Sequence, residues 1–258
     1  MKQLALFSFI AAAALPAAAQ VVLFADNFER GNLNQWTNKF NDVPHAQIVA
    51  DPLNPANRVL NFFQVNAGGD IFSARPARVD GTRQHVVLSF DFLGLPNPGT
   101  QPADIGGFAA IATDNTGYAS WFVAGTYIPA LNVPAPIATP LAADGQWHHY
   151  DIDVTDLVNA YGMTNIQVAL EDWYGLDGIA GDAYFDNIVL TAKLDPSVIE
   201  QLVPCSGPAP GKTWRNHTQY VLTMAAAVNK LYRQGLISRE EQEYYFWTAF
   251  WSRCGGRW

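Results

Sequence analysis

The sequence has few charged residues and few basic ones. Charged side chains make up 15% of its 258 residues against 49% hydrophobic ones, so a sizeable core can form and disorder is not expected. The formal net charge is −8, so by composition the chain lacks the basic surface that a phosphate-binding protein needs. We therefore expect neither nucleic acid nor an anionic membrane as a partner.

Long apolar runs are missing after the first 20 residues, and those residues are typical of a secretory signal peptide. Lys2 supplies the positive end, residues 4–15 the apolar stretch, and the alanines at 17–19 the cleavage site. The apolar stretch is shorter than the roughly 20 residues that cross a bilayer. We expect residues 1–19 to be removed and the mature chain to be exported without a membrane span, into the periplasm or out of the cell.

Cysteine is also scarce. Cys205 and Cys254 are the two cysteines, and their separation fits no zinc-binding spacing. Export to an oxidising compartment makes a disulfide between them the expected state.

Residues 20–192 show strand patterns broken by turn residues. In Gln84–Leu93 the side chains of Val86, Leu88, Phe90 and Phe92 alternate with more polar ones, as in a sheet with one buried face. Further strands are expected at 58–65, 107–113, 119–124, 147–154, 166–172 and 183–191. This pattern predicts a mainly β fold, an antiparallel jelly-roll β-sandwich.

The pattern changes after residues 193–204, which we interpret as a linker. A helical stripe of apolar residues between 221 and 231 ends at Gly235, a residue typical of helix ends. Ser238 and Glu241 then have the spacing of a capping box, which predicts a second helix to about residue 253. Residues 205–258 are thus expected to be a helical hairpin, and its disulfide is worth roughly 4 kcal/mol.

Two parts of the chain resemble known families. The segments 147–157, 166–170 and 183–190 resemble the closing strands of galactose-binding-like jelly rolls, a fold that includes many carbohydrate-binding modules. The opening at 26–31, with Trp36, resembles the first strand of the same fold. The Trp-His-His sequence at 147–149 also resembles lectin and laminin-G sandwiches, which leaves the topology open.

The second resemblance is to a helical region that recurs at the C-termini of exported bacterial proteins. It is carried by Cys205, residues 214–221, residues 235–238 and the Cys254–Gly255 pair. It implies the hairpin architecture and no particular role.

The jelly-roll resemblance implies a calcium site where the first and last strands meet. Glu29 and Asp186 match the acidic positions, and Asp26 is a weaker third. Calcium takes six to eight oxygen ligands, part of which these carboxylates would supply. The alternative is that Glu29 is solvated and Asp186 is a polar residue at a sheet end.

Exposed aromatic rings are how proteins stack on sugar rings. Trp173 and Tyr174 follow an expected strand, where they either contact a glycan or pack within a loop; Trp121 is expected mainly in the core, with ligand contact as the alternative. His149, Asp151 and Asp153 share one strand face, which we interpret as a solvated polar row.

No convincing nucleophile and base were identified. Adjacent residues of a strand diverge, so Glu171 and Asp172 do not form the converging pair of a glycosidase. The sequence therefore predicts an exported, non-catalytic protein that binds carbohydrate. The alternatives are an envelope or extracellular-matrix assembly protein and, less favoured, a polysaccharide-degrading enzyme.

The expected second helix carries more aromatic residues than a two-helix hairpin can bury, namely Tyr244, Tyr245, Phe246, Trp247, Phe250 and Trp251. They either dock the hairpin on the sandwich or form a surface for a protein partner, and docking is the favoured interpretation.

Overall fold

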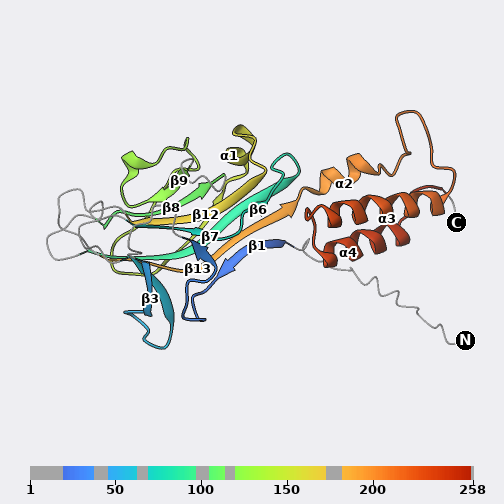
Figure 1. Ribbon diagram of the computed structural model, residues 1–258. Helices are drawn as coiled ribbons and strands as arrows, with labels where there is room; N and C mark the ends of the chain where they lie inside the picture. Colours follow the sequence, from blue (N-terminus) through green and yellow to red (C-terminus); the bar gives the residue numbers. More distant parts are fainter. Residues whose placement is uncertain are drawn as a thin grey trace, which may run out of the picture.

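Two facing β-sheets form one end of the chain and a helical hairpin the other. The computed structural model describes residues 20–37, 46–62, 69–96, 105–113, 120–172 and 182–256. Figure 1 shows the strands gathered in a sandwich and the helices projecting from one end of it. The predicted architecture, a mainly β jelly-roll sandwich followed by a helical hairpin, is confirmed.

The first sheet has six strands. Its order is β11 (His148–Asp153), β7 (Gln84–Leu95), β13 (Asp182–Leu194), β4 (Arg58–Phe62) and β3 (Ala46–Ala50), and β1 (Val21–Asp26) also pairs with β13. All pairs are antiparallel. Asp26 lies opposite Ile188, so the first and last strands are neighbours, as the resemblance implied.

The second sheet has seven strands. Its order is β10 (Thr139–Pro140), β9 (Ser120–Gly125), β8 (Gly107–Ala112), β12 (Asn165–Asp172), β5 (Gly69–Ser73) and β2 (Trp36–Thr37), and β6 (Ala77–Arg78) also pairs with β12. Only β10 and β9 run parallel among these described pairs.

The core between the sheets follows from the alternation seen in the sequence. Val86, Leu88, Phe90 and Phe92 of β7 are fully buried, while the residues between them face outward. The seven strands predicted from pattern all correspond to observed strands over their described residues. A short helix, α1 (Thr155–Ala160), was not expected; it covers one end of the core with Leu157 and Val158.

The segment interpreted as a linker is structured. β13 continues to Leu194, and α2 (Pro196–Leu202) follows, with the Asp195 side chain accepting a hydrogen bond from the Ser197 amide. Leu194 is fully buried in the apolar cluster of the helices, so the last strand leads directly into a second core.

The hairpin has the predicted signals at its helix ends. α3 (His217–Arg233) is followed by Gly235 at φ +73°, and α4 (Arg239–Trp251) begins with a capping box between Ser238 and Glu241. The Cys205–Cys254 disulfide closes the far end of the hairpin, as predicted. Among the described residues no helix is long and apolar enough to cross a membrane.

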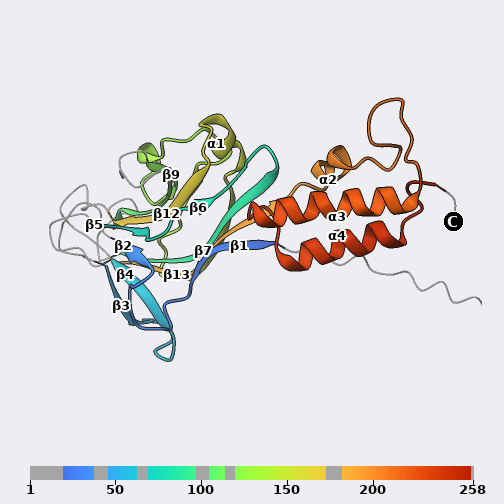
Figure 2. The same cartoon turned by 45° about the vertical axis from the view of Figure 1, so that its right-hand side comes forward.

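The hairpin meets the sandwich at the turn between α3 and α4. The Gln84 side-chain amide donates a buried hydrogen bond to the Leu236 carbonyl at 3.0 Å, and Figure 2 shows the rest of both helices projecting away from the sheets. Trp247 and Trp251 remain 52% and 72% exposed. The favoured interpretation that these rings dock the hairpin on the sandwich is therefore wrong for both tryptophans.

Candidate functional site

The structure describes only one of the three aromatic residues predicted to contact a ligand. Trp173 and Tyr174 lie outside the described residues. Trp121, in β9, is partly buried against the core, and its ring centroid lies 4.7 Å from that of Tyr161. Trp121 is therefore packed against protein on at least one side.

Glu29 and Asp186, the expected calcium ligands, are held by consecutive residues of the chain. The Asn57 side-chain amide donates to Asp186 Oδ2 at 2.9 Å, and the Arg58 backbone amide donates to Glu29 Oε1 at 3.0 Å. Burial raises the pKa of Asp186, to which the nearby charges of Asp91 and Glu29 also contribute. The two carboxylates thus share one corner of the six-stranded sheet.

Asp26 holds the turn that follows β1. It is 5% exposed, and its Oδ1 accepts from the Phe28 amide at 2.9 Å while its Oδ2 accepts from Trp36 Nε1 at 2.8 Å. These bonds stabilise Phe28 at φ +55°, a conformation that is costly for a bulky residue. Among the described residues, no three His, Cys, Asp or Glu side chains are grouped as a metal site.

A hydrogen-bonded network crosses β11, β7 and β13 on the outer face of the six-stranded sheet. His149 Nδ1 lies 2.6 Å from Asp91 Oδ1, and Asn187 donates to Asp91 Oδ2 at 2.7 Å. Ser89 donates to Asp151, whose Oδ1 lies 3.4 Å from His149 Nε2. We call these five residues the polar network.

Strand register explains why the polar network forms. His149 lies opposite Asp91, and Asp151 lies opposite Ser89, so their side chains point to the same face. The β7–β13 register shifts between Asp186 and Val189, and Asn187 adopts φ +50° in this bulge. The left-handed conformation costs most residues about 1–2 kcal/mol and is tolerated by asparagine.

The polar network is exposed and electrostatically coupled. The side chain of His149 is 58% exposed and that of Asp91 25%. The hydrogen bond with Asp91, together with the charges of Asp91 and Asp151, raises the pKa of His149. His149 therefore keeps its proton to a higher pH than an isolated histidine does.

An apolar patch lies on the same outer face. Leu93, Val59 and Tyr184 are buried there, and Trp147 is packed against them, in a cluster separate from the core between the sheets. Trp147 Nε1 lies 3.2 Å from both carboxylate oxygens of Asp51, which orients the indole ring.

Trp147 and the polar network share the outer face of β11. Trp147 immediately precedes β11, and His149 and Asp151 follow it at intervals of two residues. The result is a partly exposed ring beside several hydrogen-bond donors and acceptors, an arrangement that can bind a hydroxylated ring.

The polar network does not have the geometry of a catalytic triad. Ser89 donates to Asp151, whereas a serine nucleophile must bond to its histidine base. The sequence predicted a polar row of His149, Asp151 and Asp153, of which the first two belong to the polar network, while Asp153 accepts from the Thr155 amide instead. It did not predict Ser89, Asp91 or Asn187, because their part in the network depends on strand register and on the bulge.

No protein-family model matches the sequence, and no curated protein matches it either. A CBM22-1 xylan-binding domain from Paenibacillus barcinonensis is 14% identical, with a TM-score of 0.42 and coverage of 69% of this chain and 99% of that one. TmCBM61, solved with β-1,4-galactotriose, is 11% identical, with a TM-score of 0.35 and coverage of 64% and 92%.

Winged bean acidic lectin, solved with methyl-α-D-galactose, is 12% identical, with a TM-score of 0.43 and coverage of 67% of this chain and 98% of that one. These similarities assign neither a family nor a ligand to this chain.

Proposed function

We propose that the chain is an exported protein that binds carbohydrate without transforming it, on the outer face of the six-stranded sheet. The observation that carries the proposal is Trp147 beside the polar network. A sugar ring presents an apolar face to an aromatic ring and hydroxyl groups to carboxylates, amides and imidazoles, which matches this pairing.

Stability alone gives little reason for the polar network. Exposed ion pairs contribute about 0–1 kcal/mol, and in the His149–Asp91 pair the histidine side chain is 58% exposed. Asn187 moreover adopts a left-handed conformation while it donates to Asp91. A left-handed residue held within a polar network that adds little stability is more typical of a binding surface than of a structural one.

A glycan array followed by calorimetry on the mature chain tests this function. Asp91→Asn removes a negative charge from the centre of the polar network. Asp156→Asn removes the same charge from the exposed side of α1, outside the network. We expect Asp91→Asn to weaken glycan binding by about tenfold, or 1.4 kcal/mol, and Asp156→Asn to leave it unchanged. The proposal fails if no glycan binds or if both variants bind equally well.

Export is supported by the signal-peptide pattern and by the disulfide, which persists in oxidising compartments. Fractionation of expressing cells, with N-terminal sequencing of the recovered protein, tests it. We expect a mature chain that begins at Gln20 outside the cytoplasm, and an uncleaved cytoplasmic chain would contradict this.

Assembly through the hairpin is a second candidate function, favoured by an uneven distribution of charge. Residues 205–258 carry seven Lys or Arg and three Glu, a formal charge of +4, which leaves −12 for residues 1–204. Trp247 and Trp251 are exposed on the same helix, next to Arg253. The partner of complementary charge is the acidic sandwich of a second copy, in a head-to-tail contact.

Sedimentation at increasing concentration, at low and high salt, tests the assembly. We expect oligomers at low salt that dissociate at high salt and are lost in Trp251→Ser, with Leu222→Ser, an exposed apolar change on α3, as the control. A monomer under all conditions would exclude this candidate.

A further inference from the structure

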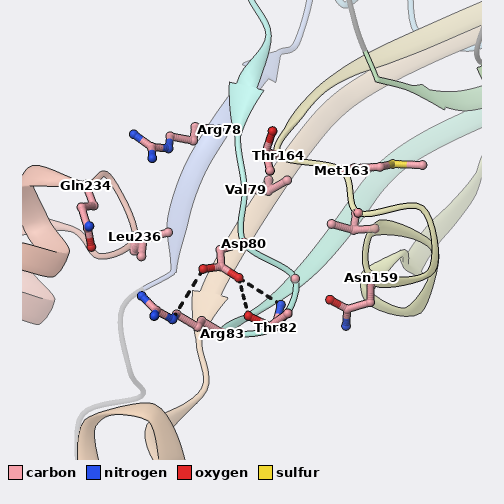
Figure 3. A pocket seen from close by; sticks show the side chains of 13 residues that line it. Arg78, Val79, Asp80, Thr82, Arg83, Asn159, Met163, Thr164, Gln234 and Leu236 are labelled. Atoms are coloured by element: carbon pink, nitrogen blue, oxygen red, sulfur yellow. Dashed lines mark hydrogen bonds and ion pairs between the residues drawn. The ribbon is translucent and has the colours of Figure 1, made fainter. Parts of the chain in front are cut away.

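A cavity of about 280 Å³ lies where the sandwich meets the hairpin. Its walls come from the turn at 78–83 that leads into β7, from residues 158–164 around the end of α1, and from Gln234 and Leu236 of the hairpin turn. Figure 3 shows these three segments converging from different elements. The sandwich and the hairpin turn therefore both contribute to the walls of this cavity.

The lining combines an apolar base with a polar opening. Val79, Val158, Met163 and Leu236 are each no more than 5% exposed. The polar side chains at the opening include Arg78, Asp80, Thr82, Arg83, Asn159 and Gln234. Small-molecule sites typically have this composition, and the volume can hold a sugar-sized molecule.

The hairpin contributes a polar atom without a partner. Gln234 Oε1 is buried and accepts no hydrogen bond from the described part of the chain. Leaving a buried acceptor unpaired is costly, and Gln234 would gain a hydrogen bond if its side chain turned toward a hydroxyl group of a molecule bound in the cavity.

The sandwich contributes an exposed cation. Arg83 pairs with Asp80 at 3.5 Å, and Asp80 also accepts hydrogen bonds from the backbone amide and the hydroxyl of Thr82, so these three side chains hold one another. Arg78 makes no ion pair or side-chain hydrogen bond with any described residue. In Figure 3 the side chain of Arg78 lies on the same side of the cavity as Gln234 of the hairpin turn.

The formal charge of the lining favours an anionic ligand. Two arginines and one aspartate give this cavity a formal charge of +1. An arginine pairs well with a carboxylate, through two parallel hydrogen bonds. The amides of Gln234 and Asn159 are suited to hydroxyl groups.

We propose that this cavity binds a small hydroxylated carboxylate, such as a single uronic acid. Its carboxylate pairs with Arg78, and its hydroxyls bond to the side-chain amides of Gln234 and Asn159. Because Arg78 belongs to the sandwich and Gln234 to the hairpin, the bound molecule bridges the two units and fixes their junction. This site is separate from the polar network and goes beyond the proposed glycan surface.

Calorimetry and NMR on the full mature chain test the proposal with galacturonate and glucuronate as probes. We expect saturable binding below about 10 mM, weakened by about tenfold in Arg78→Ala and in Gln234→Leu. Arg75→Ala is the matched control, because it removes the same exposed charge three residues away from Arg78 and outside the cavity.

Glucose and sulfate test which chemical groups of the uronates the cavity recognises. Glucose lacks the carboxylate and sulfate lacks the hydroxyls, so both should bind at least tenfold more weakly than the uronates. Equal binding of sulfate, equal losses in Arg78→Ala and Arg75→Ala, or no saturable uronate binding would each overturn the proposal.

Variants of the polar network and of the cavity serve as controls for each other. Asp91→Asn should leave uronate binding to the cavity unchanged, and Arg78→Ala should leave glycan binding to the outer face unchanged. The failure of one site is thereby distinguished from the failure of the other.

Discussion

At the scale of single residues, the protonation of His149 depends directly on its neighbour Asp91. Asp91 raises its pKa through their hydrogen bond, so the charged imidazolium is favoured in the folded state. A histidine with a raised folded pKa adds stability below its unfolded pKa, and this stability is lost as pH rises through the folded value.

An NMR titration of the His149 ring measures this effect. We expect its midpoint to lie above the ordinary value of about 6.5 and to fall in Asp91→Asn, where the acceptor charge is lost. Asp156→Asn, which is remote from the ring, should leave the midpoint in place. A midpoint that is the same in both variants would show that Asp91 does not control His149.

Calcium at Glu29 and Asp186 stays a prediction, and the burial of Asp186 makes it testable. An acid with a raised folded pKa favours folding when protonated, so its ionisation lowers stability as pH rises through that pKa. A calcium ion would offset the charge of the ionised group. We expect added calcium to raise the melting temperature at pH 7 and EDTA to reverse the rise.

Two variants test whether the effect of calcium on the melting temperature arises at Asp186. Asp186→Asn should abolish it, and Glu200→Gln, an exposed change on α2, should leave it intact. A melting temperature that is insensitive to both calcium and EDTA would exclude a structural ion bound to the native state.

At the scale of elements, the start of α4 depends on two side chains. Ser238 Oγ accepts from the Glu241 amide, and Glu241 Oε2 accepts from the Ser238 amide, while Glu241 itself is fully buried. Replacing a serine N-cap by alanine costs about 1 kcal/mol. We expect Ser238→Ala to lower the free energy of unfolding of the hairpin by about this amount in urea.

Ser206→Ala is the control for this measurement, because Ser206 is exposed and lies in the same unit outside any helix. Equal effects of the two substitutions would mean that the capping box does not set the stability of α4.

Elements with a strong local signal could be predicted from the sequence. β7 has strict alternation, and α3 has an apolar stripe that ends at a glycine, so local pattern and tertiary burial agree. α1 has six residues, too few for a helical stripe to show. α2 has a readable start, Asp195 before Pro196, but its seven residues were interpreted as part of a linker.

The candidate binding surfaces were harder to predict, because their residues come together only in three dimensions. Asp91 and Asn187 are 96 residues apart and meet through the β7–β13 register and its bulge. Arg78 and Gln234 come from the sandwich and the hairpin, and no local pattern records that these units meet there.

At the scale of the whole molecule, the chain has two cores joined by a continuous backbone. One lies between the sheets, and the other is formed by the helices together with Leu194 at the end of β13. The described contact between the units is centred on the α3–α4 turn. The stability of each unit should therefore depend mainly on its own core.

The disulfide tests this independence, because it belongs to one unit only. Cys205 and Cys254 are 49 residues apart, and closing a loop of this length stabilises the folded state by about 4 kcal/mol in the chain-entropy model. A unit as small as the hairpin has a limited core of its own. We expect reduction to increase amide exchange in α3 and α4 while β7 and β8 keep their protection.

Hydrogen-exchange mass spectrometry with and without a reductant resolves the two units, and a Cys205→Ser, Cys254→Ser double variant serves as the control for reagent effects. Loss of protection in both units together would mean that they unfold as one cooperative body, since the sandwich contains no cysteine through which the reductant could act. Unchanged exchange in the helices would instead show that α2, α3 and α4 pack well enough to hold the hairpin closed.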